Sequence, residues 1–177
     1  MKKQKIVITG GPGTGKSSII RQLEKRGHEC LHEISRQVTL EAQKQGIDQL
    51  FLEKPLLFSE KLLEGRKIQH REANMLSAST IFIDRGIPDV LAYMDYFKTE
   101  YSSYFNDACI EYSYDKIFFL PPWEEIYQSD NERYESFKEA SLIAKHLFET
   151  YKNYGYSPIE VPKTSVIDRT SFILNQI

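Results

Sequence analysis

The sequence has 177 residues, of which 41% are hydrophobic, and a formal net charge of −2. This length and composition predict one globular domain, residues 1–177, with its own buried core. The slight negative charge argues against nucleic acid or an anionic membrane surface as a partner, because both attract strongly basic proteins.

The cysteines and the hydropathy of the chain indicate in which cellular compartment the protein is expected. Cys30 and Cys109 lie far apart and belong to no CxxC or Cys/His cluster, which argues against a zinc site and against a disulfide framework. No apolar run is long enough to cross a membrane, and the first predicted strand begins at residue 5, so no signal peptide is expected. We therefore expect a cytoplasmic protein.

Short apolar runs alternate with longer helical stretches along the chain, a pattern typical of βαβ units. It predicts a parallel sheet with helices on both faces, a three-layer α/β architecture. The last strand is expected at an edge of the sheet, because Pro158 cannot donate a hydrogen bond to a neighbouring strand. The five predicted strands are residues 5–9, 29–32, 80–84, 116–120 and 158–161.

A complete phosphate-binding P-loop, GxxxxGK[ST], follows the first predicted strand directly. Its glycines let backbone N–H groups turn inward around the β- and γ-phosphates of a nucleoside triphosphate, and Lys16 adds a positive charge. Ser17 can ligate Mg²⁺ at the start of the next helix. The residues predicted to bind ATP are Gly10, Gly11, Pro12, Gly13, Thr14, Gly15, Lys16, Ser17 and Ser18.

Proline and glycine residues mark the ends of the clearest helices. Pro55 and Pro88 can each start a helix, because the first helical position needs no N–H donor. Gly27 and Gly155 can each end one. The helices are predicted at residues 17–26, 56–77, 88–97 and 137–151.

Two groups of side chains on these helices could line a pocket. Arg66, Gln69, His70 and Arg71 form a polar stripe that could bind a second substrate, although a solvated helix face explains them equally well. Six aromatic residues between positions 93 and 105 could stack on a base, but packing in the core is the stronger interpretation.

Kinases, GTPases, motors and ATP-driven machines all contain a P-loop, so other motifs must separate them. The base-reading tetrapeptide Asn-Lys-x-Asp of GTPases is absent, and no DxxG follows the third predicted strand. That strand ends in Asp84-Arg85, where a hydrolytic ATPase of the AAA+ type usually has Asp followed by Glu. The chain also lacks room for the helical second subdomain of such machines. These features favour a kinase.

Charged residues follow the second predicted strand, at the edge of the sheet where open parallel sheets bind substrates. Glu33 is a candidate base that could accept a proton from a substrate hydroxyl as it attacks the γ-phosphate. Arg36 could pair with Glu33 or bind a substrate phosphate. The alternative is a carboxylate at a helix N-terminus, with Arg36 solvated.

The third predicted strand ends with a second charged group. Asp84 could hold Mg²⁺ through water, and Arg85 could bind a phosphoryl oxygen with a bidentate fork. Asp89, in the same segment, is a candidate substrate ligand. The alternative is that Asp84 caps a turn and Arg85 forms a structural ion pair.

The segment after the fourth predicted strand is short and polar and begins with two prolines, so we expect a short helical lid over about residues 122–136. Arg133 could neutralise the charge that develops on the transferred phosphoryl group. The alternative is an exposed arginine at the start of a helix, although the helix dipole disfavours a cation there.

Four segments together resemble a family of small predicted AAA-type ATPases, over nearly the whole chain. They are the P-loop, the Glu33-Ile34-Ser35-Arg36 turn, the Asp84-Arg85-Gly86-Ile87-Pro88-Asp89 segment and the Pro-Pro-Trp-Glu…Glu-Arg-Tyr lid. That family is similar to the P-loop nucleoside and nucleotide kinases, including the ribosylnicotinamide kinase domain. The resemblance implies a P-loop NTPase fold with the kinase-like strand order 2-3-1-4-5.

The same resemblance implies roles for individual residues. A Glu-x-x-Arg turn follows strand two in the ribosylnicotinamide kinase domain, which makes Glu33 a base or substrate ligand and Arg36 a substrate contact. The Asp84-Arg85 pair resembles the Asp/Glu-Arg motif of deoxynucleoside and thymidylate kinases. Gly86 replaces the Ser, Tyr or His that often follows there, so the substrate is left open.

The sequence thus predicts an ATP- and Mg²⁺-dependent kinase that phosphorylates a small nucleoside- or nucleotide-like acceptor, as a monomer or homodimer. The alternative is an ATPase or regulatory switch that acts through a protein partner. The predicted catalytic residues are Lys16, Glu33, Arg85 and Arg133. The predicted substrate-binding residues are Glu33, Arg36, Arg66, Gln69, Asp84, Arg85 and Asp89, and the predicted metal ligands are Ser17 and Asp84.

Overall fold

The computed structural model describes residues 3–127 and 135–177. Its sheet has five parallel strands in the order β2-β3-β1-β4-β5, which confirms the predicted order and direction. Strand β5 lies at an edge, next to β4, and begins just after Pro158, as the missing N–H donor of that proline requires. The strands are β1 (Gln4–Gly10), β2 (Glu29–Leu31), β3 (Thr80–Asp84), β4 (Lys116–Leu120) and β5 (Ile159–Glu160).

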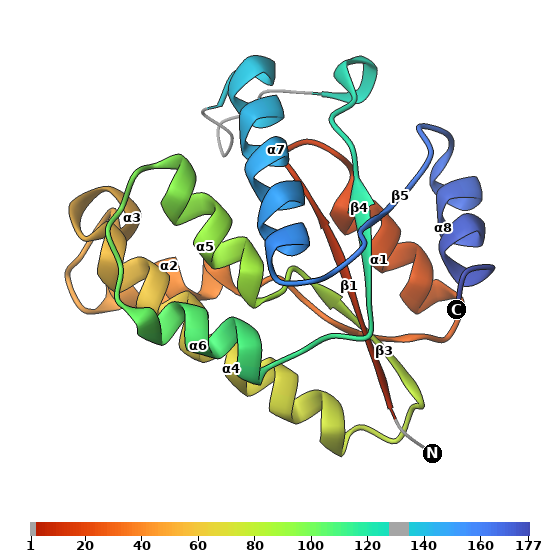
Figure 1. Cartoon of the computed structure of the whole chain (residues 1–177), viewed down its shortest axis with the longest axis horizontal. Coiled ribbons are helices and arrows are strands. Elements are labelled where there is room, and N and C mark those ends of the chain that lie inside the picture. Colours follow the sequence, from red (N-terminus) through yellow and green to blue (C-terminus); the bar gives the residue numbers. More distant parts are fainter. Residues whose placement is uncertain (1–2, 128–134) are drawn as a thin grey trace.

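Helices cover both faces of the sheet (Figure 1). Each of the four predicted helices is present within two residues of its expected bounds. The helices of the described chain are α1 (Lys16–Lys25), α2 (Ser35–Lys44), α3 (Leu50–Glu53), α4 (Pro55–Met75), α5 (Ile87–Tyr96), α6 (Ser103–Glu111), α7 (Phe137–Asn153) and α8 (Val166–Leu174). Of these, α2, α3, α6 and α8 have no counterpart among the predicted helices.

The side chains of β1 alternate between two cores, because successive residues of a strand point to opposite faces. Ile6 and Ile8 pack with Ile19 of α1 and Ile173 of α8 on one face. Val7 packs on the other face, in a cluster that includes side chains of α4 and α7. All of these side chains of β1 are fully buried, and burial of each contributes about 1.5–3 kcal/mol. The central strand that carries the P-loop is therefore held rigidly.

Two reciprocal hydrogen bonds stabilise the start of helix α7, which follows the predicted lid. The Ser136 hydroxyl accepts a hydrogen bond from the Glu139 N–H, and the Glu139 carboxylate accepts one from the Ser136 N–H, which forms a capping box. Of the predicted lid, the structure describes residues 122–127, which include a 3-10 helix, η1 (Glu124–Ile126), and residues 135 and 136. The predicted catalytic residue Arg133 lies outside the described residues.

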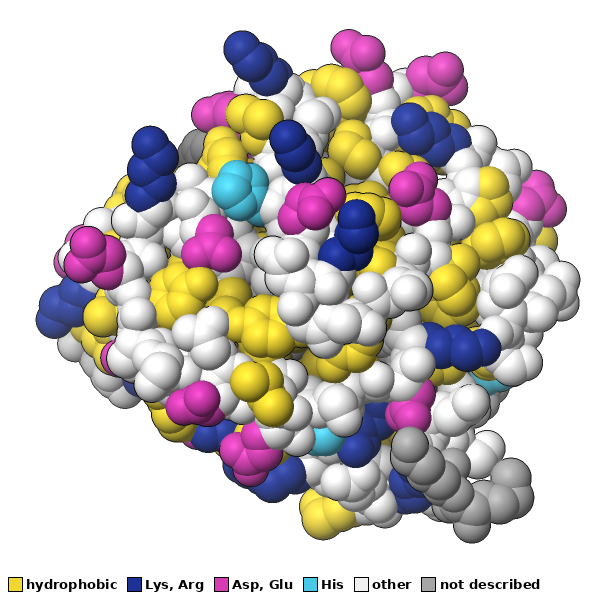
Figure 2. Space-filling view, viewed as in Figure 1, with side chains coloured by type: hydrophobic (Ala, Val, Ile, Leu, Met, Phe, Trp, Pro, Cys, Tyr) yellow, Lys and Arg dark blue, Asp and Glu magenta, His cyan; other side chains and the backbone are white. Residues whose placement is uncertain are grey.

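Charges of both signs are interspersed over the face shown in Figure 2, with hydrophobic side chains between them. This mixture agrees with the net charge of −2. None of the helices that the structure describes is long and apolar enough to cross a membrane.

Candidate active site

The P-loop connects β1 to α1 and curls around the amine of Lys16. Lys16 Nζ donates hydrogen bonds to the carbonyl oxygens of Gly10 and Gly11, each at 3.0 Å. Burial lowers the pKa of Lys16 to about 7, and the positive charge of Arg85 acts in the same direction. Phosphate oxygens placed beside this amine would raise its pKa again, so the loop is suited to an anionic ligand.

Two glycines of the P-loop are required by their backbone angles and by their neighbours. Gly13 has a φ of 72°, and a Cβ there would lie 2.5 Å from the ring of Tyr127. Gly15 has a φ of 87°, and a Cβ there would lie 3.0 Å from the guanidinium of Arg169. Side chains other than hydrogen are therefore disfavoured twice at each position.

Asp84 and Ser17 offer oxygen ligands next to the P-loop. Asp84 is buried at the end of β3, and burial raises the pKa of its carboxyl group while the nearby Lys16 opposes that shift. Its buried Oδ1 has no hydrogen-bond partner among the residues that the structure describes. Carboxylate and hydroxyl oxygens are hard ligands of the kind that Mg²⁺ prefers. The donor set therefore fits a magnesium ion.

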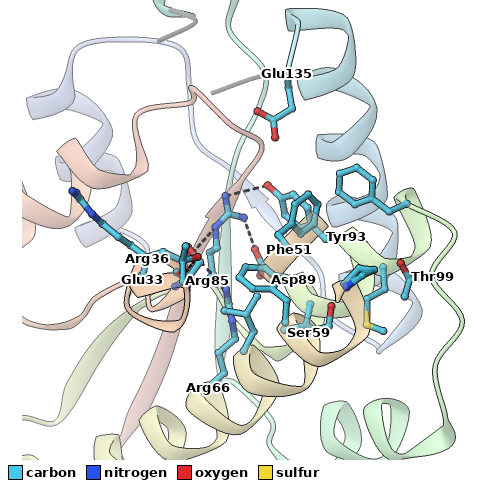
Figure 3. A pocket seen from close by; sticks show the side chains of 18 residues that line it. Glu33, Arg36, Phe51, Ser59, Arg66, Arg85, Asp89, Tyr93, Thr99 and Glu135 are labelled. Atoms are coloured by element: carbon cyan, nitrogen blue, oxygen red, sulfur yellow. Dashed lines mark hydrogen bonds and ion pairs between the residues drawn. The ribbon is translucent and has the colours of Figure 1, made fainter. Parts of the chain in front are cut away.

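A network of charged side chains joins the ends of β2 and β3 to α4 (Figure 3). Glu33 Oε2 lies 2.7 Å from Arg85 Nε, and Glu33 Oε1 lies 3.1 Å from Arg66 Nη2. The Ile34 and Ser35 N–H groups also donate to Oε1, at 2.9 and 3.0 Å. Burial alone would raise the pKa of Glu33, but the two guanidinium groups and the backbone donor of Ser35 hold it below its usual range. Glu33 is thus an ionised carboxylate at neutral pH.

Asp89 of α5 holds Arg85 within this network. It is 1% exposed and accepts hydrogen bonds from the Thr9 hydroxyl at 2.7 Å, Arg85 Nη1 at 2.9 Å and the Gly86 N–H at 3.0 Å. The Tyr151 hydroxyl of α7 donates a fourth. The oxygens of Asp89 are therefore engaged by donors within the protein. Although Asp89 was predicted to bind substrate, its contacts are those of a residue that positions Arg85.

Arg85 has a strained backbone, with a φ of 71° in the left-handed region that few non-glycine residues adopt. Its N–H donates to the Ile8 carbonyl at 3.1 Å, and its guanidinium lies between Glu33, Asp89 and the hydroxyl of Tyr93. Such strain persists only where surrounding contacts over-determine it, and it concentrates at functional sites. The structure holds this guanidinium beside the P-loop strand.

The remaining predicted site residues lie in different places. Arg66 and Gln69 are both buried, so the solvated-face alternative is wrong for them. Arg66 also donates to the Gly86 carbonyl at 2.9 Å and is part of the network. Gln69 donates to the His32 carbonyl at 2.6 Å and is not among the residues that line the cavity described next. Arg36 is exposed on α2, and its side chain extends away from Arg85 (Figure 3).

A cavity of about 500 Å³ opens beside the network, between α2, α3, α4 and α5. This volume is typical of a small-molecule site. Its charged and polar lining comes from Glu33, Ser35, Arg36, Thr39, Ser59, Arg66, Arg85, Asp89, Tyr93, Thr99 and Glu135, and its apolar lining from Phe51, Pro55, Phe58, Leu62, Val90, Met94 and Phe97.

The predicted aromatic cluster divides between the cavity and the core. Tyr93 and Phe97 line the cavity, and the Arg85 guanidinium lies 5.3 Å from the ring centre of Tyr93. Phe105 is buried in the core, as the sequence indicated, whereas Tyr104 is largely exposed. Phe51 of α3 and Phe58 of α4 also line the cavity. Neither was predicted to be a site residue.

Arg169 is a residue of the nucleotide side that no motif indicated. It is 5% exposed on α8, donates to the Thr14 carbonyl at 2.8 Å and has its guanidinium 5.6 Å from the ring of Trp123. Its Nε is buried without a hydrogen-bond partner among the described residues. In the sequence Arg169 is one arginine of a short helix, and only the fold brings it to the P-loop.

Solved structures with the same fold include several kinases. A deoxyadenosine kinase from M. mycoides, with dCMP and dCDP bound, matches with a TM-score of 0.75 and 20% identity over 98% of each chain. A thymidylate kinase from Candida albicans matches with a TM-score of 0.68 and 17% identity, over 99% of this chain and 91% of that one. The NadR protein in complex with NR matches with a TM-score of 0.73 and 16% identity, over 98% of this chain and 49% of that one.

At these identities the structural matches show a shared fold. No curated protein matches the chain significantly. A family model described as "AAA domain" matches residues 5–169, from the first strand to the arginine of α8 that contacts the P-loop. The chain therefore belongs to this AAA domain family of P-loop proteins.

Proposed function

We propose that this protein is a Mg²⁺-dependent kinase that transfers the γ-phosphoryl group of ATP to a small nucleoside- or nucleotide-like acceptor. One observation carries the proposal: the Glu33–Arg85 pair lines a cavity of ligand size and stands next to the P-loop. Arg85 is close enough to Lys16 for its charge to lower the pKa of that amine. A phosphoryl donor and an acceptor would thus meet at this pair.

The P-loop side of the site would hold the triphosphate. Backbone N–H groups of the loop and the Lys16 ammonium would bind the β- and γ-phosphate oxygens. Ser17 and Asp84 would hold Mg²⁺, which when bound neutralises phosphate charge. Arg169 would keep the loop in shape through its hydrogen bond to the Thr14 carbonyl.

On the other side, Glu33 would accept a hydrogen bond from the acceptor hydroxyl and orient its oxygen towards the γ-phosphorus. The low pKa of Glu33 makes it a weak base, which suffices because the transition state of phosphoryl transfer is loose and needs little proton removal. Its carboxylate then receives the proton from the acceptor oxygen as the new P–O bond forms. Arg85 would stabilise charge on the transferred group, and Arg133 remains a sequence prediction in the same role.

The test is ADP release from Mg-ATP, measured with and without a panel of nucleosides, nucleotides and small alcohols. A kinase releases ADP slowly until its acceptor arrives, because the assembled site excludes water. We expect stimulation by one class of acceptor and its loss in Glu33→Gln. The matched control is Glu24→Gln, which removes an exposed carboxylate paired with His32 and should leave the stimulation intact.

Turnover that is equally fast without any acceptor, and unaffected by Glu33→Gln, would contradict the kinase assignment. The protein would then be an ATPase or a nucleotide-dependent switch, and Glu33 would have no role as an acceptor base.

A further inference from the structure

Resting on the proposed kinase function, we infer that the acceptor is a compound without a phosphate, which presents a hydroxyl group to Glu33 and an aromatic or apolar ring to the far end of the cavity. The inference separates a nucleoside-like acceptor from a nucleoside monophosphate. It follows from the charge balance at one end of the cavity and from the composition of the other.

Two of the three arginines that line the cavity, Arg66 and Arg85, have anionic partners, while the third, Arg36, is exposed and extends away from Arg85 (Figure 3). Arg66 pairs with Glu33, and Arg85 pairs with both Glu33 and Asp89. Arg66 is 4% exposed and uses Nη1 for the Gly86 carbonyl. A phosphate dianion that bound Arg66 or Arg85 would have to displace one of these buried pairs and lie beside the Glu33 carboxylate, whose negative charge repels it.

A neutral hydroxyl can bind without breaking the network. Glu33 Oε1 is crowded by the Ile34 and Ser35 N–H groups and by Arg66. Oε2 has one short partner, Arg85 Nε at 2.7 Å, and a longer contact with Arg66 at 3.4 Å. A carboxylate oxygen has two lone-pair directions, so a hydroxyl donor can replace the longer Arg66 contact at Oε2 while Arg66 keeps its ion pair with Oε1 at 3.1 Å.

The far end of the cavity is aromatic. Phe51 lies edge-on to Phe58 and to Phe97, with ring centres 5.5 and 5.1 Å apart. Phe51 and Phe97 are 38% and 43% exposed, so a ring bound against them would remove apolar surface from water. The cavity is also lined by the hydroxyls of Ser59, Thr39 and Thr99 and by the carboxylate of Glu135, whose negative charge would repel a phosphate.

Side-chain amides contribute nothing to the lining formed by the described residues, nor do lysine or histidine. Bidentate reading of a base edge would need an amide or a charged group at the far end. The cavity is therefore built to select a ring by shape and stacking, and to select its reactive group by the charge network.

The experiment compares matched ligand pairs: adenosine with AMP, and thymidine with dTMP. Binding is measured by calorimetry with the P-loop filled by Mg²⁺ and a non-hydrolysable ATP analogue, so that a phosphate cannot bind there instead. ADP release from Mg-ATP is measured in parallel. We expect at least one nucleoside to bind about tenfold or more tightly than its monophosphate, and to be the member of the pair that stimulates ADP release.

Two variants sharpen the comparison. Glu33→Gln leaves Arg66 and Arg85 with less anionic charge, so it should bind the monophosphate about tenfold more tightly than the wild type while losing kinase activity. Phe51→Ala should raise the KM for the nucleoside about tenfold with a smaller change in kcat. Its control is Leu52→Ala, the exposed neighbour on the same short helix that does not line the cavity.

The outcomes separate this inference from the proposed function. Stimulation by a monophosphate but not by its nucleoside keeps the kinase and overturns the inference. Nucleoside binding without any stimulation of ADP release supports the preference of the cavity but contradicts the kinase. Binding of no nucleoside, with the ATP analogue in place, overturns the inference.

Discussion

Replacing Asp89 with Asn tests whether this buried carboxylate fixes Arg85, the proposed catalytic arginine. Four donors converge on its two oxygens, from Thr9, Arg85, Gly86 and Tyr151. An Asn side chain has the same shape but must turn an NH₂ group towards two of these donors. The hydroxyls can rotate away, whereas the Gly86 N–H and the Arg85 guanidinium are fixed by their surroundings.

The cost follows from these contacts. Loss of the charge-assisted hydrogen bond to Arg85 costs about 1.5–3 kcal/mol, and a buried donor left without a partner costs about 1–3 kcal/mol. Arg85 keeps its pair with Glu33, so we expect a total near 3 kcal/mol, or about 6–12 °C in Tm for a chain of this size. Because Arg85 would also shift, kcat should fall by about tenfold or more.

The assay is thermal unfolding followed by calorimetry, together with acceptor-dependent ADP release. The matched control is Asp95→Asn on the same helix, where the exposed carboxylate bonds only to the Tyr101 hydroxyl among the contacts described, and a loss below about 1 kcal/mol is expected. An Asp89→Asn variant that unfolds within about 2 °C of the wild type, with full activity, would refute the anchoring role.

Three further predictions concern the nucleotide side. Arg169→Met should raise the Kd for ATP about tenfold, because one charge-assisted hydrogen bond to Thr14 is lost. An unchanged Kd in titration calorimetry would show that this bond does not support ATP binding. The pKa of Lys16 is about 7, and ATP should raise it, so binding at pH 8 should take up about 0.9 proton and binding at pH 6 only about 0.1. Calorimetry in two buffers of different ionisation enthalpy measures this proton uptake. Lys16→Met should abolish it. An uptake that is equal at pH 6 and pH 8 would contradict the lowered pKa of Lys16. Gly13→Ala should weaken ATP binding or stability by about 1–3 kcal/mol because of its positive φ and the Tyr127 ring, and equal ATP affinity and Tm in the variant would contradict this packing.

The parts of the fold that depend on local pattern could be predicted from the sequence. The five strands and the long helices follow from short apolar runs, proline and glycine positions, and a motif with a fixed structural context, whereas the strand order was implied by the resemblance to P-loop kinases. The short helix α3 carries no such pattern, and the predicted helix start at Pro55 did not indicate that Phe58 faces a cavity. The aromatic end of the cavity formed by Phe51 and Phe58 was therefore not predicted.

Pairings between distant residues could not be predicted in the same way. Arg36 was expected to pair with Glu33 or to bind a substrate phosphate, but the ion pairs described for Glu33 are with Arg66 and Arg85, which reach it from other elements. Asp89 was expected to bind substrate, and only the packing of α5 against β1 and α7 shows that Thr9 and Tyr151 engage its oxygens. Such contacts depend on how helices cross the sheet, which spacing along one chain does not define.

The most direct test of the proposed function follows the γ-phosphate of ATP labelled with ³²P. The protein, Mg²⁺ and labelled ATP are incubated with the acceptor that stimulates ADP release, and the products are separated. We expect the label to appear in the organic acceptor, in amounts equal to the ADP formed, and we expect Glu33→Gln to prevent this transfer. Label recovered only as inorganic phosphate, with or without acceptor, would contradict the proposed kinase reaction.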